Sequence, residues 1–162
     1  MRMRSLAALL LGSTVLAAAP VQAQQKPEDV IKFRKGVYQV INWHIRPLGL
    51  MVKGAQPYNP ELFTKNAAIL EQMTKILPES YVPGSDVGDT RAKPEIWKEP
   101  EKFKQAMDRL QAESTKLTEV SKGGNLDQVR AQFGALSKAC SSSPSAANCG
   151  SCRRRPRRCW MF

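Results

Sequence analysis

Cysteine is absent from the first 139 residues of this 162-residue chain, because all four cysteines lie at positions 140, 149, 152 and 159. A fold built before that point therefore does not depend on disulfide bonds. The chain has a single histidine, His44, which excludes zinc catalysis by several histidines and disfavours a Ser–His hydrolase. A glycine-rich phosphate loop, a catalytic pairing of carboxylates and an alternating strand pattern are also missing. We therefore expect no enzyme and no β-sheet.

Long apolar runs are equally scarce, and the one present lies near the start, from Leu6 to Ala19. Two arginines precede it, and a small-x-small sequence ends at Ala23. This arrangement predicts a secretory signal peptide over residues 1–23, cleaved after Ala23. The run is too short to span a bilayer comfortably, so we expect no stable membrane insertion and a periplasmic location for the mature protein.

The net charge of +11 is concentrated at the two ends of the chain. Residues 1–23 hold two arginines and residues 141–162 hold five, and neither segment has an acidic residue. The segment between them is only mildly basic and does not gather its Lys and Arg residues on one face. We therefore expect no nucleic-acid partner. The short arginine run of residues 153–158 leaves association with anionic surfaces as a minor alternative.

Helical periodicity predicts an all-α fold, an antiparallel four-helix bundle over residues 24–140 with an irregular C-terminal tail. The first helix starts at Pro27, and Pro47 is expected to kink or divide it. The second starts at the Asn59 cap, the third runs from Pro100 to the glycines at 123 and 124, and the fourth starts at the Asn125 cap. Residues 78–99 are predicted to form a long irregular crossover, and residues 141–162 an atypical tail rich in Ser, Arg and Cys.

Apolar stripes on two of these helices predict which side chains face the core. The stripe of the first helix is Val30, Phe33, Val37, Ile41 and Leu48. The stripe of the fourth is Leu126, Val129, Phe133, Leu136 and Cys140. Cys140 therefore points inward, either as a small buried thiol or as an attachment point.

Several segments together resemble the cytochrome c prime family, the class II c-type cytochromes. The segments are residues 26–29, 32–34, 52–58, 88–91, 94–97, 103–104, 133–136 and 138–140. The resemblance implies a four-helix bundle that carries heme c. It also implies iron bound at Cys-x-x-Cys-His, and a role in electron transfer or in binding small gases such as nitric oxide. A redox partner protein, or a gas ligand, and a homodimer through the first two helices are further implications.

The resemblance also assigns site residues. Arg34 matches the position that reaches a heme propionate, and Tyr38 the position facing the open side of the iron. Asp89 matches a loop position near the heme edge, and Cys140 matches the first thioether cysteine. The chain departs from the family at Ser143, which replaces the second cysteine, and at Pro144. Pro144 replaces the axial histidine and has no ligand atom, so no metal ligand is assigned.

These departures leave two main interpretations open. The first is a periplasmic c-type heme protein in which the usual heme attachment is disrupted. The second is a heme-free degenerate bundle, acting as a small binding module or arising from a shifted reading frame after Cys140. Cys149 and Cys152 form a C-x-x-C that Arg153 follows instead of His. This pair could be part of a zinc site, a redox pair, or simply free or disulfide-paired thiols.

Overall fold

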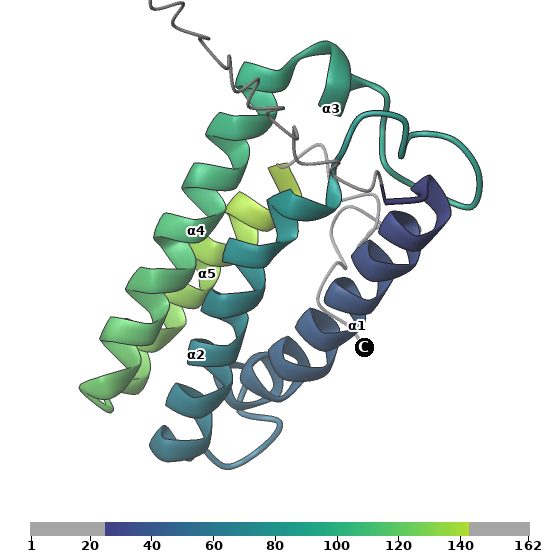
Figure 1. The fold of residues 1–162 in the computed structure, drawn as a ribbon. Coiled ribbons are helices and arrows are strands. Elements are labelled where there is room, and N and C mark those ends of the chain that lie inside the picture. The colour runs from purple at the N-terminus through teal and green to yellow at the C-terminus, as the bar shows by residue number, and fades with distance from the viewer. Residues whose placement is uncertain (1–24, 143–162) are drawn as a thin grey trace, which may run out of the picture.

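The computed structural model describes residues 25–142, and these form an up-and-down bundle of four long helices (Figure 1). The long helices are α1 (Pro27–Val52), α2 (Pro60–Ile76), α4 (Pro100–Lys122) and α5 (Leu126–Ser142). A 3-10 turn, η1 (Leu77–Ser80), and a short helix, α3 (Glu95–Lys98), lie in the crossover between α2 and α4. The described residues contain no strand. The predicted all-α four-helix bundle is therefore confirmed.

Local sequence signals set most helix ends. The Asn59 side chain accepts a hydrogen bond from the backbone N–H of Leu62 at 2.9 Å and caps α2. Asn125 does the same for α5, accepting from the N–H groups of Asp127 and Gln128 at 3.0 and 3.1 Å. Gly124 has a φ of 69°, which favours glycine and ends the α4 segment. These predicted boundaries are confirmed.

The structure corrects one expectation about α1 and narrows another. Pro47 was expected to kink or divide the helix, and it does not divide it, because α1 continues without interruption to Val52. The kink stays a prediction. Proline removes the hydrogen bond to the carbonyl four residues earlier, at Trp43. Trp43 is 78% exposed, so the lost hydrogen bond belongs to a residue on the solvent-facing side of α1. Phe33 was expected in the core but is 47% exposed, and the neighbouring Arg34 is buried in its place.

The helices pack unevenly around the bundle. Contacts are most extensive between α2 and α4, between α4 and α5, and between α1 and α2, whereas α1 and α5 touch over a smaller region. The core centres on Leu48, Phe63, Leu117 and Val129, none of which is measurably exposed. One side of the bundle, between α1 and α5, is therefore less closed than the others.

Within residues 25–142, no helix is both long enough and apolar enough to cross a membrane. Residues 1–24 and 143–162 lie outside the described part of the chain. The predicted signal peptide, Ser143, Pro144 and the other tail cysteines all fall there.

Candidate functional site

Tyr38 and Cys140 meet at an internal cavity of about 30 Å³ in the centre of the bundle. Cys140 is half-buried on the last turns of α5, and Tyr38 is buried on α1. All four long helices and η1 contribute to the wall, which consists of Tyr38, Ile41, Ile45, Leu70, Thr74, Leu77, Leu110, Ser114, Leu136 and Cys140. The fold therefore brings together two of the four predicted site residues.

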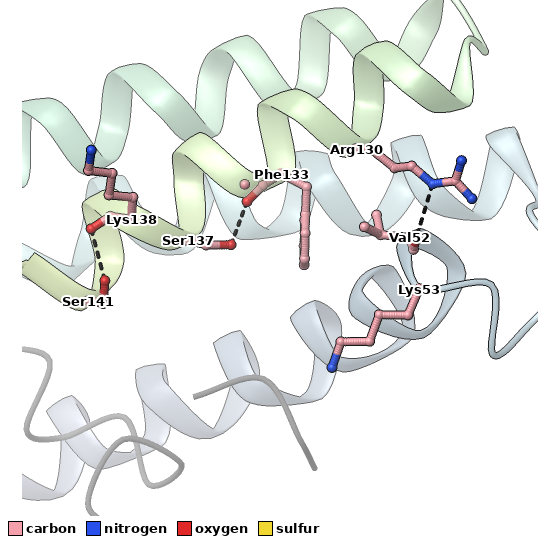
Figure 2. A pocket seen from close by; sticks show the side chains of 8 residues that line it. Val52, Lys53, Arg130, Phe133, Ser137, Lys138 and Ser141 are labelled. Carbon is pink, nitrogen blue, oxygen red and sulfur yellow. Dashed lines mark hydrogen bonds between the residues drawn. The ribbon is translucent and has the colours of Figure 1, made fainter. Parts of the chain in front are cut away.

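A larger, open groove of about 450 Å³ lies on the α1–α5 side of the bundle (Figure 2). The end of α1 contributes Val52 and Lys53, and α5 contributes Arg130, Phe133, Gly134, Ser137, Lys138 and Ser141. The Nε–H of Arg130 donates to the Val52 carbonyl at 3.0 Å and joins the two walls at one end. A volume of this size is within the range of roughly 300–1,000 Å³ that is typical of ligand pockets.

Arg34 is buried, with 1% of its surface exposed, and it binds the crossover after α2. Its Nε and Nη2 donate to the Ser80 carbonyl at 3.0 and 2.6 Å. Its Nη1 donates to the Ser85 carbonyl at 3.1 Å and to Thr90 Oγ1 at 3.0 Å, and its Nη2 also donates to Ser85 Oγ. These bonds use all five N–H groups of the guanidinium. Every acceptor is neutral, and no carboxylate of the described residues forms an ion pair with Arg34.

Aromatic rings surround the rest of the Arg34 side chain. The guanidinium carbon lies 4.3 Å from the centroid of the Tyr81 ring and 5.6 Å from that of Trp97. The Tyr81 hydroxyl is 3.0 Å from the Tyr38 hydroxyl, which links this cluster to the cavity wall. Desolvation by burial lowers the pKa of Arg34, and the nearby phenols of Tyr81 and Tyr38 oppose that shift. Since an arginine titrates far above neutral pH, Arg34 stays charged.

Asp89 lies on the surface of the crossover, and its carboxylate pairs with Lys35 of α1. The hydrogen bond and charge of Lys35 lower the pKa of Asp89. Asp89 lines neither the cavity nor the groove. In the structure the Lys35–Asp89 pair therefore links the crossover to α1 at the surface. Lys35 and Asp89 are the sequence neighbours of Arg34 and Thr90, which are hydrogen-bonded to each other.

His44 lies at the interface between α1 and α2, where its Nδ1 is 2.7 Å from Oδ1 of Asn66. It lines neither the groove nor the cavity. The only imidazole of the chain is therefore placed away from Cys140 and Tyr38.

Sequence reasoning found the helix positions of the site but missed its crossover partners. Ser80, Ser85, Thr90 and Tyr81 follow no helical period, so no pattern marked them as contacts of α1. Some residues that line the groove could be found from the sequence. Val52-Lys53 and Phe133-Gly134 belong to segments that support the family resemblance, and the fold places them on opposite walls of the groove.

These features define a four-helix bundle with an open groove between α1 and α5 and a half-buried cysteine at a separate cavity inside the bundle. The chain belongs to the cytochrome c prime family, since the family model for cytochrome c' matches residues 29–143. The family consists of c-type cytochromes, which carry heme c.

Individual relatives agree with this assignment. The chain is 31% identical over 121 residues to cytochrome c' of Alcaligenes xylosoxydans xylosoxydans, covering 75% of this chain and 94% of the relative. It is 32% identical over 117 residues to cytochrome c' of Rubrivivax gelatinosus, covering 72% and 91%. The crystal structure of the Rubrivivax gelatinosus protein superposes with a TM-score of 0.68 over 72% of this chain and 91% of that one. A cytochrome c prime variant from Alcaligenes xylosoxidans, solved as a nitric oxide complex, matches at 31% identity with the same TM-score and coverage.

The groove has enough volume for a cofactor, but the described donor atoms do not suit a c-type heme. Such a heme needs two thiols and an imidazole from C-x-x-C-H, and residues 25–142 supply only Cys140. His44 is placed elsewhere, and the donors of Arg34 are already bound to the crossover. No cluster of three or more His, Cys, Asp or Glu side chains in this part of the chain could hold a metal ion.

Proposed function

We propose that this chain is a periplasmic heme protein of the cytochrome c prime type whose heme attachment is weakened by its own sequence. Its role would be electron transfer or the binding of a small gas such as nitric oxide, with no enzymatic turnover. The observation that carries the proposal is the meeting of Cys140 and Tyr38 at one cavity inside the bundle. Bound heme would supply a redox-active iron. The protein itself would supply the apolar enclosure and one thiol.

The second candidate, a heme-free bundle, is favoured by a separate observation. Pro144 occupies the sequence position of the axial histidine, and no imidazole lines the groove or the cavity among the described residues. The core around Cys140 is also closely packed, since its cavity has a volume of only about 30 Å³. A heme-free chain of this kind would keep the bundle and lose the iron chemistry.

Restoring the attachment sequence separates the two candidates. The wild type and the double variant Ser143→Cys/Pro144→His are each produced with a c-type maturation system. Heme is measured from the visible spectrum and from intact mass after acid–acetone extraction. We expect a Soret band and one heme mass in the double variant, and much less covalently held heme in the wild type. Adding Cys140→Ala to the double variant provides the negative control and should lower the yield again.

Each outcome of this comparison decides one part of the proposal. Equal covalent heme in the wild type and the double variant would overturn the weakened attachment. Absence of heme from a folded double variant would overturn the heme-protein proposal and leave the heme-free bundle. The location is tested by fractionating cells that express the full chain. Recovery of the protein from the cytoplasm, with residues 1–23 still attached by mass, would refute the periplasmic location.

The partner proposal is a homodimer formed through α1 and α2. Phe33, Val40 and Trp43 are 47%, 38% and 78% exposed and recur at steps of seven and three along one face of α1. Leu62 of α2 is also 43% exposed. Large apolar side chains gathered on one helix face favour contact with a partner, and a second copy of the chain offers the same surface.

A further inference from the structure

The open groove between α1 and α5 has a cationic end and an apolar middle (Figure 2). Lys53 and Arg130 lie at the end of the groove beside Val52, and the Phe133 ring lies farther along it. Lys138 adds a third cationic residue near the opposite end. Among the described residues, no aspartate or glutamate lines the groove. The local charge of this groove therefore favours an anionic ligand.

The Arg130 guanidinium keeps part of its hydrogen-bonding capacity for such a ligand. Its Nε donates to the Val52 carbonyl at 3.0 Å, and its Nη1 donates to the Asp127 carboxylate at 3.1 Å. Its Nη2 has no acceptor within the part of the chain that the structure describes. The Asp127 side chain is 90% exposed, so water screens its pair with Arg130 and the pair opposes a ligand only weakly. Because the Nε bond already orients the guanidinium, less side-chain entropy is lost on binding.

The middle of the groove suits an apolar group. The Phe133 ring lies close to α1, since a Cβ added at Gly49 would be 3.7 Å from Phe133 Cζ. On α5, the place of a Cβ at Gly134 has no heavy atom within 4 Å, so the groove is open there. The hydroxyls of Ser137 and Ser141 donate to carbonyls of α5 at 2.5 and 3.1 Å and are not offered to an anion. The groove therefore separates a place for charge from a place for apolar surface.

We propose that this groove binds an organic carboxylate with an apolar chain, such as a medium-chain fatty acid. The carboxylate accepts hydrogen bonds from Arg130 Nη2 and lies near the charge of Lys53. The chain lies along Phe133 and removes apolar surface from water. The groove volume of about 450 Å³ leaves room for both parts. The site requires neither Cys140 nor heme, so it does not depend on the heme proposal.

Decanoate, kept below its micelle-forming concentration, is the probe for the full chain produced without heme maturation. Titration should give saturable amide chemical-shift changes at Lys53, Gly134 and Ser137, which line the groove. Acetate has the same carboxylate without the chain, and 1-decanol has a chain of the same length without the charge. Each should bind at least about tenfold more weakly than decanoate by calorimetry. Raising the ionic strength to about 0.5 M should weaken decanoate binding, because salt screens the exposed cations.

Two matched pairs of variants test the location. Arg130→Gln should weaken decanoate binding about fivefold, the effect of one partly exposed ion pair, whereas Arg109→Gln changes an exposed arginine of α4 outside the groove and should not. Gly134→Leu should fill the groove and abolish binding. Ala131→Leu introduces the same side chain at an exposed position of α5 that does not line the groove, and this variant should keep the wild-type affinity.

Two results would overturn the inference. One is a wild-type protein that binds decanoate no more tightly than acetate or 1-decanol. The other is an unchanged decanoate affinity in Arg130→Gln. If Gly134→Leu fails to fold by circular dichroism, the comparison of the two arginine variants decides the location by itself.

Discussion

Arg34 is the only charged side chain that is buried in the described part of the chain. Its neutral acceptors, the carbonyls of Ser80 and Ser85 and two hydroxyls, belong to a crossover with few helical hydrogen bonds of its own. A charged donor strengthens such bonds roughly twofold compared with neutral ones. Arg34 therefore attaches the crossover to α1 from inside, and the Lys35–Asp89 pair does so at the surface.

Replacing Arg34 by methionine should destabilise the protein by about 2–3 kcal/mol, because the Ser80 and Ser85 carbonyls lose their buried donors. The free energy of unfolding from urea titration measures this change. Hydrogen exchange in residues 81–94 should also accelerate, since that segment loses its attachment to α1. Arg109→Met, at an exposed arginine of α4, is the matched control and should change stability by no more than about 0.5 kcal/mol. Equal stability of the two variants would show that Arg34 does not anchor the crossover.

Arg34 also shows what the sequence could not predict at this scale. The apolar stripe assigned Phe33 to the core, because phenylalanine is usually buried and arginine usually exposed. Burial of Arg34 depends on acceptors 46 to 56 positions away in the sequence. Such acceptors have no periodic signal, so only the assembled crossover reveals that α1 turns Arg34 inward and Phe33 outward.

At the scale of the helices, local chemistry made the boundaries predictable. Asn59 and Asn125 can each bind free N–H groups at a helix start, and proline at Pro100 suits the first helical position. Continuity through Pro47 was not predictable from the residue itself. It depends on which side of α1 faces solvent, and that side is fixed by packing against α2 and α5.

The α2–α4 interface contains a largely buried carboxylate, that of Glu71. Glu71 has a side chain that is only 13% exposed, and it accepts from Lys75 at 2.7 Å and from Thr115 at 3.1 Å. The hydrogen bond from Lys75 is the main cause of a pKa lowered from the ordinary value of 4.5. A depressed folded-state pKa means that the ionised carboxylate stabilises the fold above the unfolded-state pKa.

Glu71→Gln should therefore cost about 1 kcal/mol of stability at about pH 7. The difference from the wild type should shrink as the pH falls through the lowered pKa and vanish at a pH below it, where Glu71 of the wild type would be protonated in the folded and the unfolded state alike. Urea titrations at both pH values give the comparison. Glu119→Gln is the control, because Glu119 also pairs with a lysine but is 62% exposed, so its effect should stay below about 0.5 kcal/mol. A pH-independent loss in Glu71→Gln would rule out this linkage.

For the molecule as a whole, the fold agrees with the family, whereas the heme-attachment sequence departs from it. The bundle, the cavity at Cys140 and the groove between α1 and α5 all lie in residues that the family model covers. The departures at Ser143 and Pro144 are a property of the sequence alone. The bundle could be predicted from the sequence, because apolar periodicity and helix caps mark each of its helices. Volumes such as the cavity and the groove result from the packing of all four helices and have no counterpart in any one segment.

The exposed face of α1 gives the last prediction, which concerns assembly. In a symmetric dimer each copy contributes the same patch, so Val40→Glu would place two new carboxylates in the contact and bury them without partners. We expect the wild type to sediment as a dimer and Val40→Glu as a monomer, with the helical content unchanged by circular dichroism. Val87→Glu makes the same chemical change at a crossover valine that is 64% exposed, and this variant should remain dimeric. A monomeric wild type, or dissociation of both variants alike, would mean that Phe33, Val40 and Trp43 do not form the dimer contact.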